Sequence, residues 1–419
     1  MLESTIARGQ GIYNTAASTS LIELGIFQQA LRQSIAAARN STQKSEWEAY
    51  LYKSTTSAIA PLSNATADAG LPLDRLSIGS ALIHEYKTTR DEAFLPSIQA
   101  LEKSVLLQQR NANGGLWYYA NPTNISYYHN LSYLDGMFSY APFAVLSTTL
   151  NAPTQRNAAD GTPLFGPAAA LKQLQLLYDI CHQPSGLLAH GYDASKAHNW
   201  SNPITSASPL VWGRALAWYT LGVVNTLELL QTHHSDQPNG SHAGSNSAVA
   251  SITKIFNSIV SAQINASEHA FEKTGEYGVW QVVDHPGDSG NFVEASASCM
   301  TVYSLLRAVR LHFITDPAMR HRAITNALGI YNTVVKTFLS EAGNGTISMS
   351  GTSSVASLAG ESIDYEVSKK TSDADPSIKR QKADEHLLPQ YYISRPTVNN
   401  SLIGTSAFIL ASLEVEHLR

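Results

Sequence analysis

Hydrophobic positions along this chain recur mostly with the period of an α-helix. Leu21, Leu24, Phe27 and Leu31 form one stripe at helical spacing, with polar residues between them. Pro167 precedes a further apolar stripe, at a place that proline favours in the first turn of a helix. The whole pattern predicts eleven helices. They cover approximately residues 21–35, 47–59, 78–86, 93–107, 133–150, 167–181, 214–230, 248–264, 293–313, 317–339 and 402–414.

The connections between these helices are unequal. The link between Arg310 and Pro317 is short, whereas 111–132 and 185–212 are long and rich in Gly, Asn, Tyr and Trp. This alternation suits helical hairpins arranged in a ring, with the long loops gathered on one face. No linker rich in Pro, Gly, Ser or charge divides the chain, so we expect one domain over residues 1–419.

Runs with the alternating pattern of a strand are scarce. Residues 347–349 and 390–393 could form small strands at the rim of the ring. Residues 232–247 are polar and of low complexity, and residues 368–385 are polar and charged. We expect both of these segments to be exposed insertions.

Charge and cysteine content narrow the classes of function. The formal net charge is −5 and no basic run stands out, which argues against nucleic acid as the main partner. No apolar stretch approaches the length of a membrane-spanning helix, so no membrane partner is expected. Cys181 and Cys299 lie far apart without a CxxC pattern, which disfavours a zinc site. We expect two buried thiols, with one disulfide as the alternative.

Glycosylation sequons are more frequent than such a composition would give by chance. Residues 1–20 lack the charged and apolar regions of a signal peptide. The excess nevertheless suggests an extracellular protein whose signal has been trimmed, and the alternative is a cytoplasmic protein with accidental sequons. The sequons begin at Asn40, Asn64, Asn124, Asn130, Asn199, Asn239, Asn265, Asn344 and Asn399.

Three segments combine glycine, aromatic and acidic residues close to predicted helix starts. They are 114–118 with 133–137, 190–193 with 212–214, and 278–282 with 294–296. Aromatic faces stack on sugar rings, carboxylates bind hydroxyls or move protons, and glycine allows close approach of a ligand. The combination predicts a sugar-binding pocket, although it does not specify a reaction.

Each of these residues also has a structural interpretation. Asp135 could cap the helix that follows it, and Asp193 could be a turn residue. Arg214 opens a helix, where a positive charge is slightly unfavourable, which hints that it binds an anion or a carboxylate. Trp212 and Trp280 could equally belong to the core.

The ordered set of these motifs resembles the unsaturated rhamnogalacturonyl hydrolases of glycoside hydrolase family 105. The resemblance spans residues 20–415 and includes 141–143 and 404–408. It implies an all-α (α/α)6 barrel, a ring of six helical hairpins with a pocket at one mouth. It also implies hydration of the C4=C5 bond of an unsaturated uronic acid, with Asp193 as acid and base and Asp135 as the supporting carboxylate.

The same resemblance implies the substrate-binding residues. A proton donor at near-neutral pH needs a raised pKa, which a second carboxylate and an aromatic enclosure would provide. Tyr192 stands where the family often has Trp. Glu294 has no assigned role other than supporting the residues that contact the substrate. The resemblance implies no metal or cofactor. The residues expected to bind the oligosaccharide are His190, Tyr192, Trp212, Arg214, Trp218, Trp280, Gln281, Trp117 and His129.

Three alternatives remain open. Unsaturated glucuronyl hydrolases of family 88 share the barrel and the paired aspartates but act on lyase products of glycosaminoglycans. A non-catalytic sugar-binding protein on this scaffold would lack an acid at position 135 or 193, and both acids are present. A sugar epimerase would need paired histidines at the mouth, and no such pair is evident.

Overall fold

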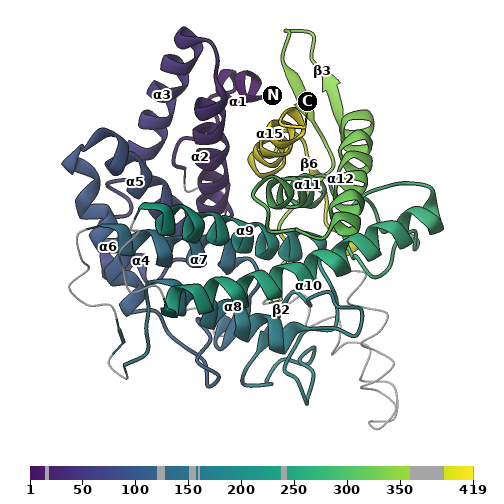
Figure 1. Cartoon of the computed structure of the whole chain (residues 1–419), viewed down its shortest axis with the longest axis horizontal. Helices are drawn as coiled ribbons and strands as arrows, with labels where there is room; N and C mark the ends of the chain where they lie inside the picture. The colour runs from purple at the N-terminus through teal and green to yellow at the C-terminus, as the bar shows by residue number, and fades with distance from the viewer. Residues whose placement is uncertain are drawn as a thin grey trace.

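Six helices form the inner wall of a closed ring in the computed structural model of the chain. Each packs against the next, and the last returns to the first. In Figure 1, α7 and α9 cross the middle of the view, with α2 and α5 on one side and α11 and α15 on the other. The inner helices are α2 (Ser20–Ala37), α5 (Arg75–Thr89), α7 (Gly136–Leu146), α9 (Gly213–Asp236), α11 (Ala295–Arg310) and α15 (Leu402–Glu416).

The structure describes residues 1–14, 18–119, 128–150, 157–158, 161–236, 243–358 and 391–418. The outer helices pack against the inner helices that precede them in the chain, and the short α1 packs against α15. The predicted all-α (α/α)6 barrel is therefore confirmed. The outer helices are α1 (Leu2–Ala7), α3 (Ser41–Thr56), α6 (Leu95–Leu106), α8 (Pro167–Cys181), α10 (Ala243–Thr274) and α12 (Pro317–Phe338).

All eleven predicted helices are present. Recognisable start signals place them: the side chains of Asn40 and Asp316 accept hydrogen bonds from backbone N–H groups of α3 and α12, and prolines begin α8 and α12. Among the described residues, α1 and α4 (Ala65–Asp68) were not predicted, because six and four residues are too few to display a period.

The inner helices run in the same direction, which gathers their beginnings at one end of the ring. Arg214 and Glu294 meet at the starts of α9 and α11. Arg307 meets Glu228 and Glu414 near the ends of α11, α9 and α15. We call the end that holds the helix starts the mouth and the opposite one the far end.

Short antiparallel strand pairs accompany the helices. They are β1 (Leu131–Tyr133) with β2 (Gly191–Asp193), β3 (Leu339–Glu341) with β4 (Ile347–Met349), and β5 (Thr352–Ser353) with β6 (Thr397–Val398). The strand predicted at 347–349 is confirmed. The strand predicted at 390–393 is wrong for 391–393, which are helical, and Gln390 lies outside the described residues.

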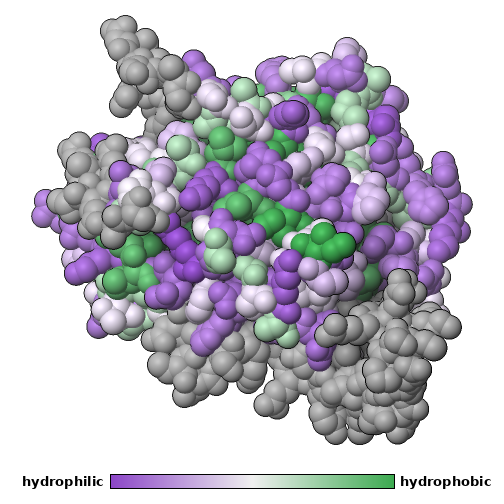
Figure 2. All heavy atoms as spheres, turned by 90° about the horizontal axis from the view of Figure 1, so that it is seen from below, coloured by the Kyte–Doolittle hydropathy of each residue, from purple (hydrophilic) through white to green (hydrophobic). Residues whose placement is uncertain are grey.

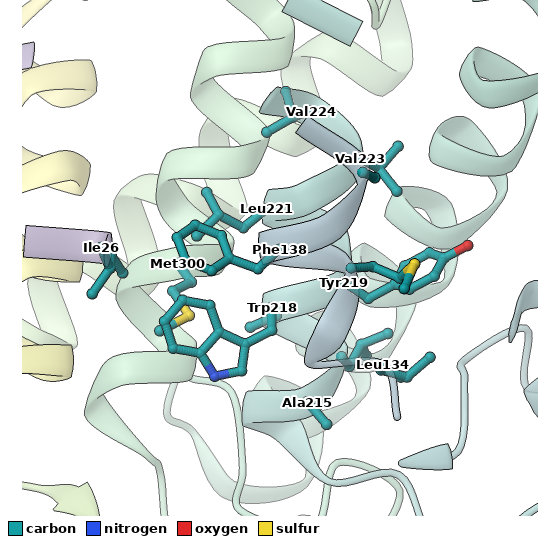
Figure 3. Packing of buried hydrophobic residues seen from close by; sticks show 14 of the residues in the cluster. Ile26, Leu134, Phe138, Ala215, Trp218, Tyr219, Leu221, Val223, Val224 and Met300 are labelled. Carbon is teal, nitrogen blue, oxygen red and sulfur yellow. The ribbon is translucent and has the colours of Figure 1, made fainter. Parts of the chain in front are cut away.

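Apolar side chains from the inner helices fill the middle of the ring. Figure 3 shows the rings of Phe138 and Trp218 beside Met300, with Ile26 facing them from a neighbouring helix. The centroids of the two rings lie 4.6 Å apart, and Trp218 is 2% exposed. Trp218 is thus a core residue here, and its predicted role in binding substrate finds no support because its ring packs against Phe138.

The remaining expectations have mixed outcomes. Cys181 and Cys299 are both free and buried. Part of the insertion expected at 232–247 is helical, because α9 runs to Asp236 and α10 begins at Ala243, while 237–242 lie outside the described residues. The insertion expected at 368–385 lies outside them altogether, as do the sequons at Asn124 and Asn239.

None of the described helices is long and apolar enough to span a membrane. Figure 2 views the molecule from below, and on the uncovered part of this face hydrophobic side chains lie in small groups between hydrophilic ones.

The close contact of α7 and α9 depends on Gly222. A Cβ atom at this position would lie 2.4 Å from the backbone oxygen of Met137, so even alanine would push the two helices apart. Gly222→Ala should lower the free energy of unfolding by about 1–3 kcal/mol, measured by urea denaturation. Gly343→Ala is the control, since a Cβ there meets nothing within 4 Å. Equal stability of the two variants would contradict this account.

Candidate active site

Two carboxylates stand at the beginnings of neighbouring inner helices at the mouth. Asp74 immediately precedes α5, and Asp135 immediately precedes α7. Both residues already have helical backbone angles, and neither side chain accepts a capping hydrogen bond. The interpretation of Asp135 as a helix cap is therefore wrong, and both carboxylates remain available for other interactions.

The two helix starts lie against each other. A Cβ atom on Gly136 would lie 2.9 Å from the side chain of Leu73, which shows how closely the segments approach. Backbone hydrogen bonds run from Leu73 N to Tyr118 O and from Tyr118 N to Leu131 O, linking both segments to strand β1. Asp74 is 2% exposed and Asp135 is 8% exposed, so Asp135 is the more accessible carboxylate.

Burial raises the pKa of Asp74 to about 7, and the charge of Asp135 acts in the same direction. Tyr118 donates a hydrogen bond from its hydroxyl to Oδ2 of Asp74 at 2.7 Å, and this bond and the cation of Arg75 oppose the rise without cancelling it. Oδ1 of Asp74 has no hydrogen-bond partner among the described residues. Asp74 is therefore a group that changes protonation near neutral pH.

His190 lies beside Asp135. Its Nε2 is 3.4 Å from Oδ2 of Asp135, and its Nδ1 is 2.8 Å from the hydroxyl of Tyr392. Its ring lies 5.1 Å from that of Tyr133 and 4.7 Å from that of Trp212. The backbone bond from Leu134 N to His190 O extends the β1–β2 pairing and fixes this position. His190 thus joins the acidic pair to an aromatic wall.

A buried amide supports that wall. Oε1 of Gln281 accepts a hydrogen bond from the indole Nε1 of Trp212, and its Nε2 donates to the backbone oxygen of Tyr392. Gln281 itself is fully buried. The predicted placement of Trp212 at the mouth is supported, whereas Gln281 holds Trp212 and Tyr392 in place instead of facing a ligand.

Arg214 does not offer a free cation to a substrate. Its guanidinium donates to the backbone oxygens of Ser353 and Ser354, both at 2.6 Å, and lies 4.8 Å from the Trp212 ring. Glu294, 3.4 Å from Arg214, caps α11 through the N–H of Ala297 and also accepts from the N–H of Ser353. Arg214 and Glu294 together tie strand β5 to the starts of α9 and α11.

Asp193 is saturated with hydrogen bonds and closed off from solvent. Oδ1 accepts from the N–H and hydroxyl of Ser195, and Oδ2 accepts from the N–H groups of Ala197 and His198 and lies 2.8 Å from Nδ1 of His198. Burial alone would raise the pKa of Asp193, but these hydrogen bonds outweigh it and hold that pKa well below its usual value. The prediction of a raised pKa at Asp193 is wrong, because the carboxylate organises its own loop.

Two predicted binding aromatics also face inward. Tyr192 is fully buried, and its hydroxyl accepts a hydrogen bond from the side-chain amide of Asn111 at 3.0 Å. Trp280 is 8% exposed and packs with Ala270 and Val293 in a small separate cluster. Both rings pack against protein in this arrangement, and their predicted roles in binding the oligosaccharide remain predictions.

Trp117 and His129 stack on each other. Their ring centroids are 5.0 Å apart and both side chains are partly exposed. Within the described part of the chain, no hydrogen bond or ring contact joins this pair to Asp135 or His190. Their predicted role in binding therefore remains a prediction.

Asp74 and Tyr392 are the important residues that sequence reasoning missed. Asp74 precedes an apolar helix just as Asp135 does, and that parallel was an available signal. The helix predicted at 78–86 began several residues too late to reveal it. Tyr392 is remote in sequence from every other site residue, so only the fold brings it to His190.

The described residues contain no group of three or more His, Cys, Asp or Glu side chains placed to hold a metal ion. The mouth holds the carboxylates of Asp74 and Asp135, the imidazole of His190 and several aromatic rings. Such a set can move protons within a partly dry pocket that accepts a sugar ring.

Comparison with known proteins places this geometry in a family. Protein Atu3128 of Agrobacterium fabrum is 26% identical over 246 residues, which cover 58% of this chain and 88% of that protein. A family 105 glycoside hydrolase from C. acetobutylicum ATCC 824 has the same fold, with a TM-score of 0.72 at 24% identity over 99% of this chain and 98% of that one.

An unsaturated glucuronyl hydrolase from Bacillus sp. GL1 also shares the fold, with a TM-score of 0.58 at 11% identity over 99% of this chain and 94% of that one. The model of Glycosyl Hydrolase Family 88 matches residues 27–419. The resemblance to the related families 105 and 88 is thus confirmed. Since this match includes all six inner helices except the first turns of α2, the chain belongs to glycosyl hydrolase family 88 and is a glycoside hydrolase.

Proposed function

We propose that this enzyme releases a terminal unsaturated uronic acid from oligosaccharides by hydrating its C4=C5 bond, with Asp135 and Asp74 as the proton-transfer pair. The observation that carries the proposal is the pair itself. Two uncapped carboxylates begin adjacent inner helices, and the charge of one raises the pKa of the other. The pair replaces Asp193 in the acid and base role, since Asp193 has no free oxygen.

The chemistry follows from Asp74, which holds a proton near neutral pH beside the charge of Asp135. The more exposed Asp135 relays that proton to C4, and positive charge develops at C5 and the ring oxygen. Water adds at C5 and returns a proton to the carboxylate. The resulting hemiketal opens, and the neighbouring sugar leaves from C1. The cycle restores the starting protonation state and consumes one water.

The surroundings of the pair favour these steps. The pKa of about 7 at Asp74 keeps a proton available at neutral pH, which general acid catalysis requires. Nε2 of His190 lies 3.4 Å from Oδ2 of Asp135, an oxygen that has no hydrogen bond among the described residues, and the rings of Tyr133 and Trp212 flank His190. Aromatic walls of this kind limit water around the reacting double bond and strengthen the electrostatic coupling.

We further propose that the substrate is an unsaturated galacturonyl-rhamnose fragment of rhamnogalacturonan. Support comes from the similarity to the family 105 enzyme from C. acetobutylicum and from the motifs shared with that family. The second candidate is an unsaturated glucuronyl substrate, favoured by the family 88 match and by the shared fold of the Bacillus enzyme, which is described as responsible for the degradation of glycosaminoglycan.

A panel of lyase products tests the reaction and the substrate together. The enzyme should remove the ultraviolet absorbance of the double bond from rhamnogalacturonan-lyase products faster than from glycosaminoglycan-lyase products. Asp135→Asn should lower kcat by about 10²–10⁴-fold on the preferred substrate. Asp179→Asn, on the exposed side of outer helix α8, is the matched control and should leave kcat unchanged. Unaltered absorbance with every product, or normal turnover by Asp135→Asn, would refute the proposal.

The raised pKa of Asp74 predicts how the free energy of unfolding and the turnover rate depend on pH. Its folded pKa of about 7 exceeds the ordinary 3.8, so between those values the folded protein keeps a proton that the unfolded chain has released. The free energy of unfolding should therefore fall as pH rises through this interval. Asp74→Asn has no carboxyl group to titrate. The Tm of this variant relative to that of the natural protein should therefore be higher at pH 8 than at pH 5.

Turnover of the natural protein should decline about tenfold per pH unit above pH 7, because the proton on Asp74 is lost there.

A pH–rate profile that stays flat from pH 6 to 9 would remove the pair from the reaction. A Tm difference for Asp74→Asn that does not change with pH would show that Asp74 does not titrate in this interval.

The substitution Asp193→Asn tests whether Asp193 stabilises its loop or takes part in proton transfer. An amide nitrogen would replace an oxygen that accepts from backbone N–H groups, so the free energy of unfolding should fall by about 2–4 kcal/mol. Turnover per folded molecule should suffer less than in Asp135→Asn. An unchanged Tm together with abolished turnover would restore Asp193 as the proton donor.

A further inference from the structure

A second cavity lies inside the ring. Its volume is about 230 Å³, and it extends from Ser77 and Phe138, each three residues beyond an aspartate of the acidic pair, to Glu228 and Arg307 toward the far end. Phe138 forms part of its wall and packs against Trp218 in the apolar core. Figure 3 shows that packing. We call this space the far cavity.

One side of the far cavity is a set of oriented amides. Gln29 and Asn225 exchange two hydrogen bonds through their side-chain amides, at 3.1 and 3.0 Å. Gln33 donates to the hydroxyl of Tyr303 at 2.7 Å. Because these partners fix the amide orientations, their remaining donors and acceptors are preorganised for hydroxyl groups.

Apolar residues line the cavity as well. Phe138, Pro142 and Leu146 of α7 and Leu229 of α9 contribute, and the carboxylate of Glu228 also lines it. Polar and apolar groups in one lining match a ring or chain that carries both hydroxyls and C–H groups. The cavity is smaller than the roughly 300–1,000 Å³ of sites for drug-sized ligands, so it suits a single sugar-sized unit.

Arg32 supplies a cation that the protein leaves without a partner. No hydrogen bond or ion pair engages its guanidinium within the described part of the chain, although Glu85 on α5 and Glu228 on α9 act on it at longer range. The other guanidinium that lines the cavity is occupied, since Arg307 pairs with Glu228 and Glu414. A partly exposed guanidinium on a cavity wall can pair with a carboxylate that accepts two hydrogen bonds at once.

We propose that the far cavity binds a small hydroxylated monocarboxylate of the size of one sugar acid. Its carboxylate pairs with Arg32, and its hydroxyls meet the amides of Gln29, Gln33 and Asn225. The lining of this cavity does not include Asp74, Asp135 or His190, so the proposal does not depend on the reaction proposed at the mouth.

Calorimetric titration of the full chain tests the site. Galacturonate should bind at least tenfold more tightly than galactose, which has the same hydroxyls without the carboxylate. Arg32→Gln should weaken galacturonate binding at least tenfold, and Ser80→Leu should do the same by filling the cavity, which Ser80 lines. Asp135→Asn, at the mouth, should leave the affinity unchanged.

Several results would overturn the proposal. They are no binding of galacturonate, equal binding of galactose, unchanged affinity in Arg32→Gln or Ser80→Leu, and loss of binding in Asp135→Asn. If neither cavity variant folds, Arg32→Lys, which keeps the charge but not the paired N–H donors, replaces them and should also weaken galacturonate binding. Turnover of lyase products by Arg32→Gln reports separately on the mouth, so the two proposals can fail independently.

Discussion

The parallel packing of six inner helices is the constraint from which the chemistry of this protein follows. Because every inner helix begins at the same end, side chains that are hundreds of residues apart in sequence meet in one small volume. Gly222 illustrates how tight this packing is, since a Cβ there would strike the backbone of α7. Any substitution that shifts α7 against its neighbours moves Asp135 relative to Asp74 and His190.

Four buried carboxylates divide into two kinds. Glu294 and Asp193 accept several hydrogen bonds from backbone and side chains, which stabilise their charged forms. Asp74 and Asp135 cap nothing, and each keeps one oxygen without a hydrogen-bond partner among the described residues. All four are buried, so the difference in pKa between Asp74 and Asp193 reflects hydrogen bonding more than burial. The same residue type is thus a fixed anion in one place and a proton carrier in another.

The sequence was enough to predict eleven helices, because each is at least eleven residues long, and the resemblance to family 105 supplied their arrangement in a ring. It was less informative about the site. The pattern His-Gly-Tyr-Asp marks both a site residue, His190, and a structural one, Asp193, and only the partners of each side chain distinguish them. One local sign was available, since Ser195 stands two residues after Asp193, the spacing at which an aspartate often bonds a following backbone N–H.

Sequence could not resolve the aromatic residues for a related reason. Tyr192 and Tyr133 lie on paired strands, yet only Tyr133 contacts His190, while the hydroxyl of Tyr192 ends against Asn111. Asp74 was hidden by a helix boundary that was placed too late, and Tyr392 by its distance along the chain. In each case the deciding fact is a long-range contact that periodicity does not encode.

The inner helices also explain how one ring can hold two separate polar regions. Polar groups buried in a barrel must be satisfied or they destabilise it, which is why the far end is rich in paired amides and ion pairs. Arg32 is partly exposed on the wall of the far cavity and has neither a hydrogen bond nor an ion pair within the described part of the chain. A guanidinium placed there can pair with an anion without giving up a contact inside the protein, which is why the cavity points to a ligand.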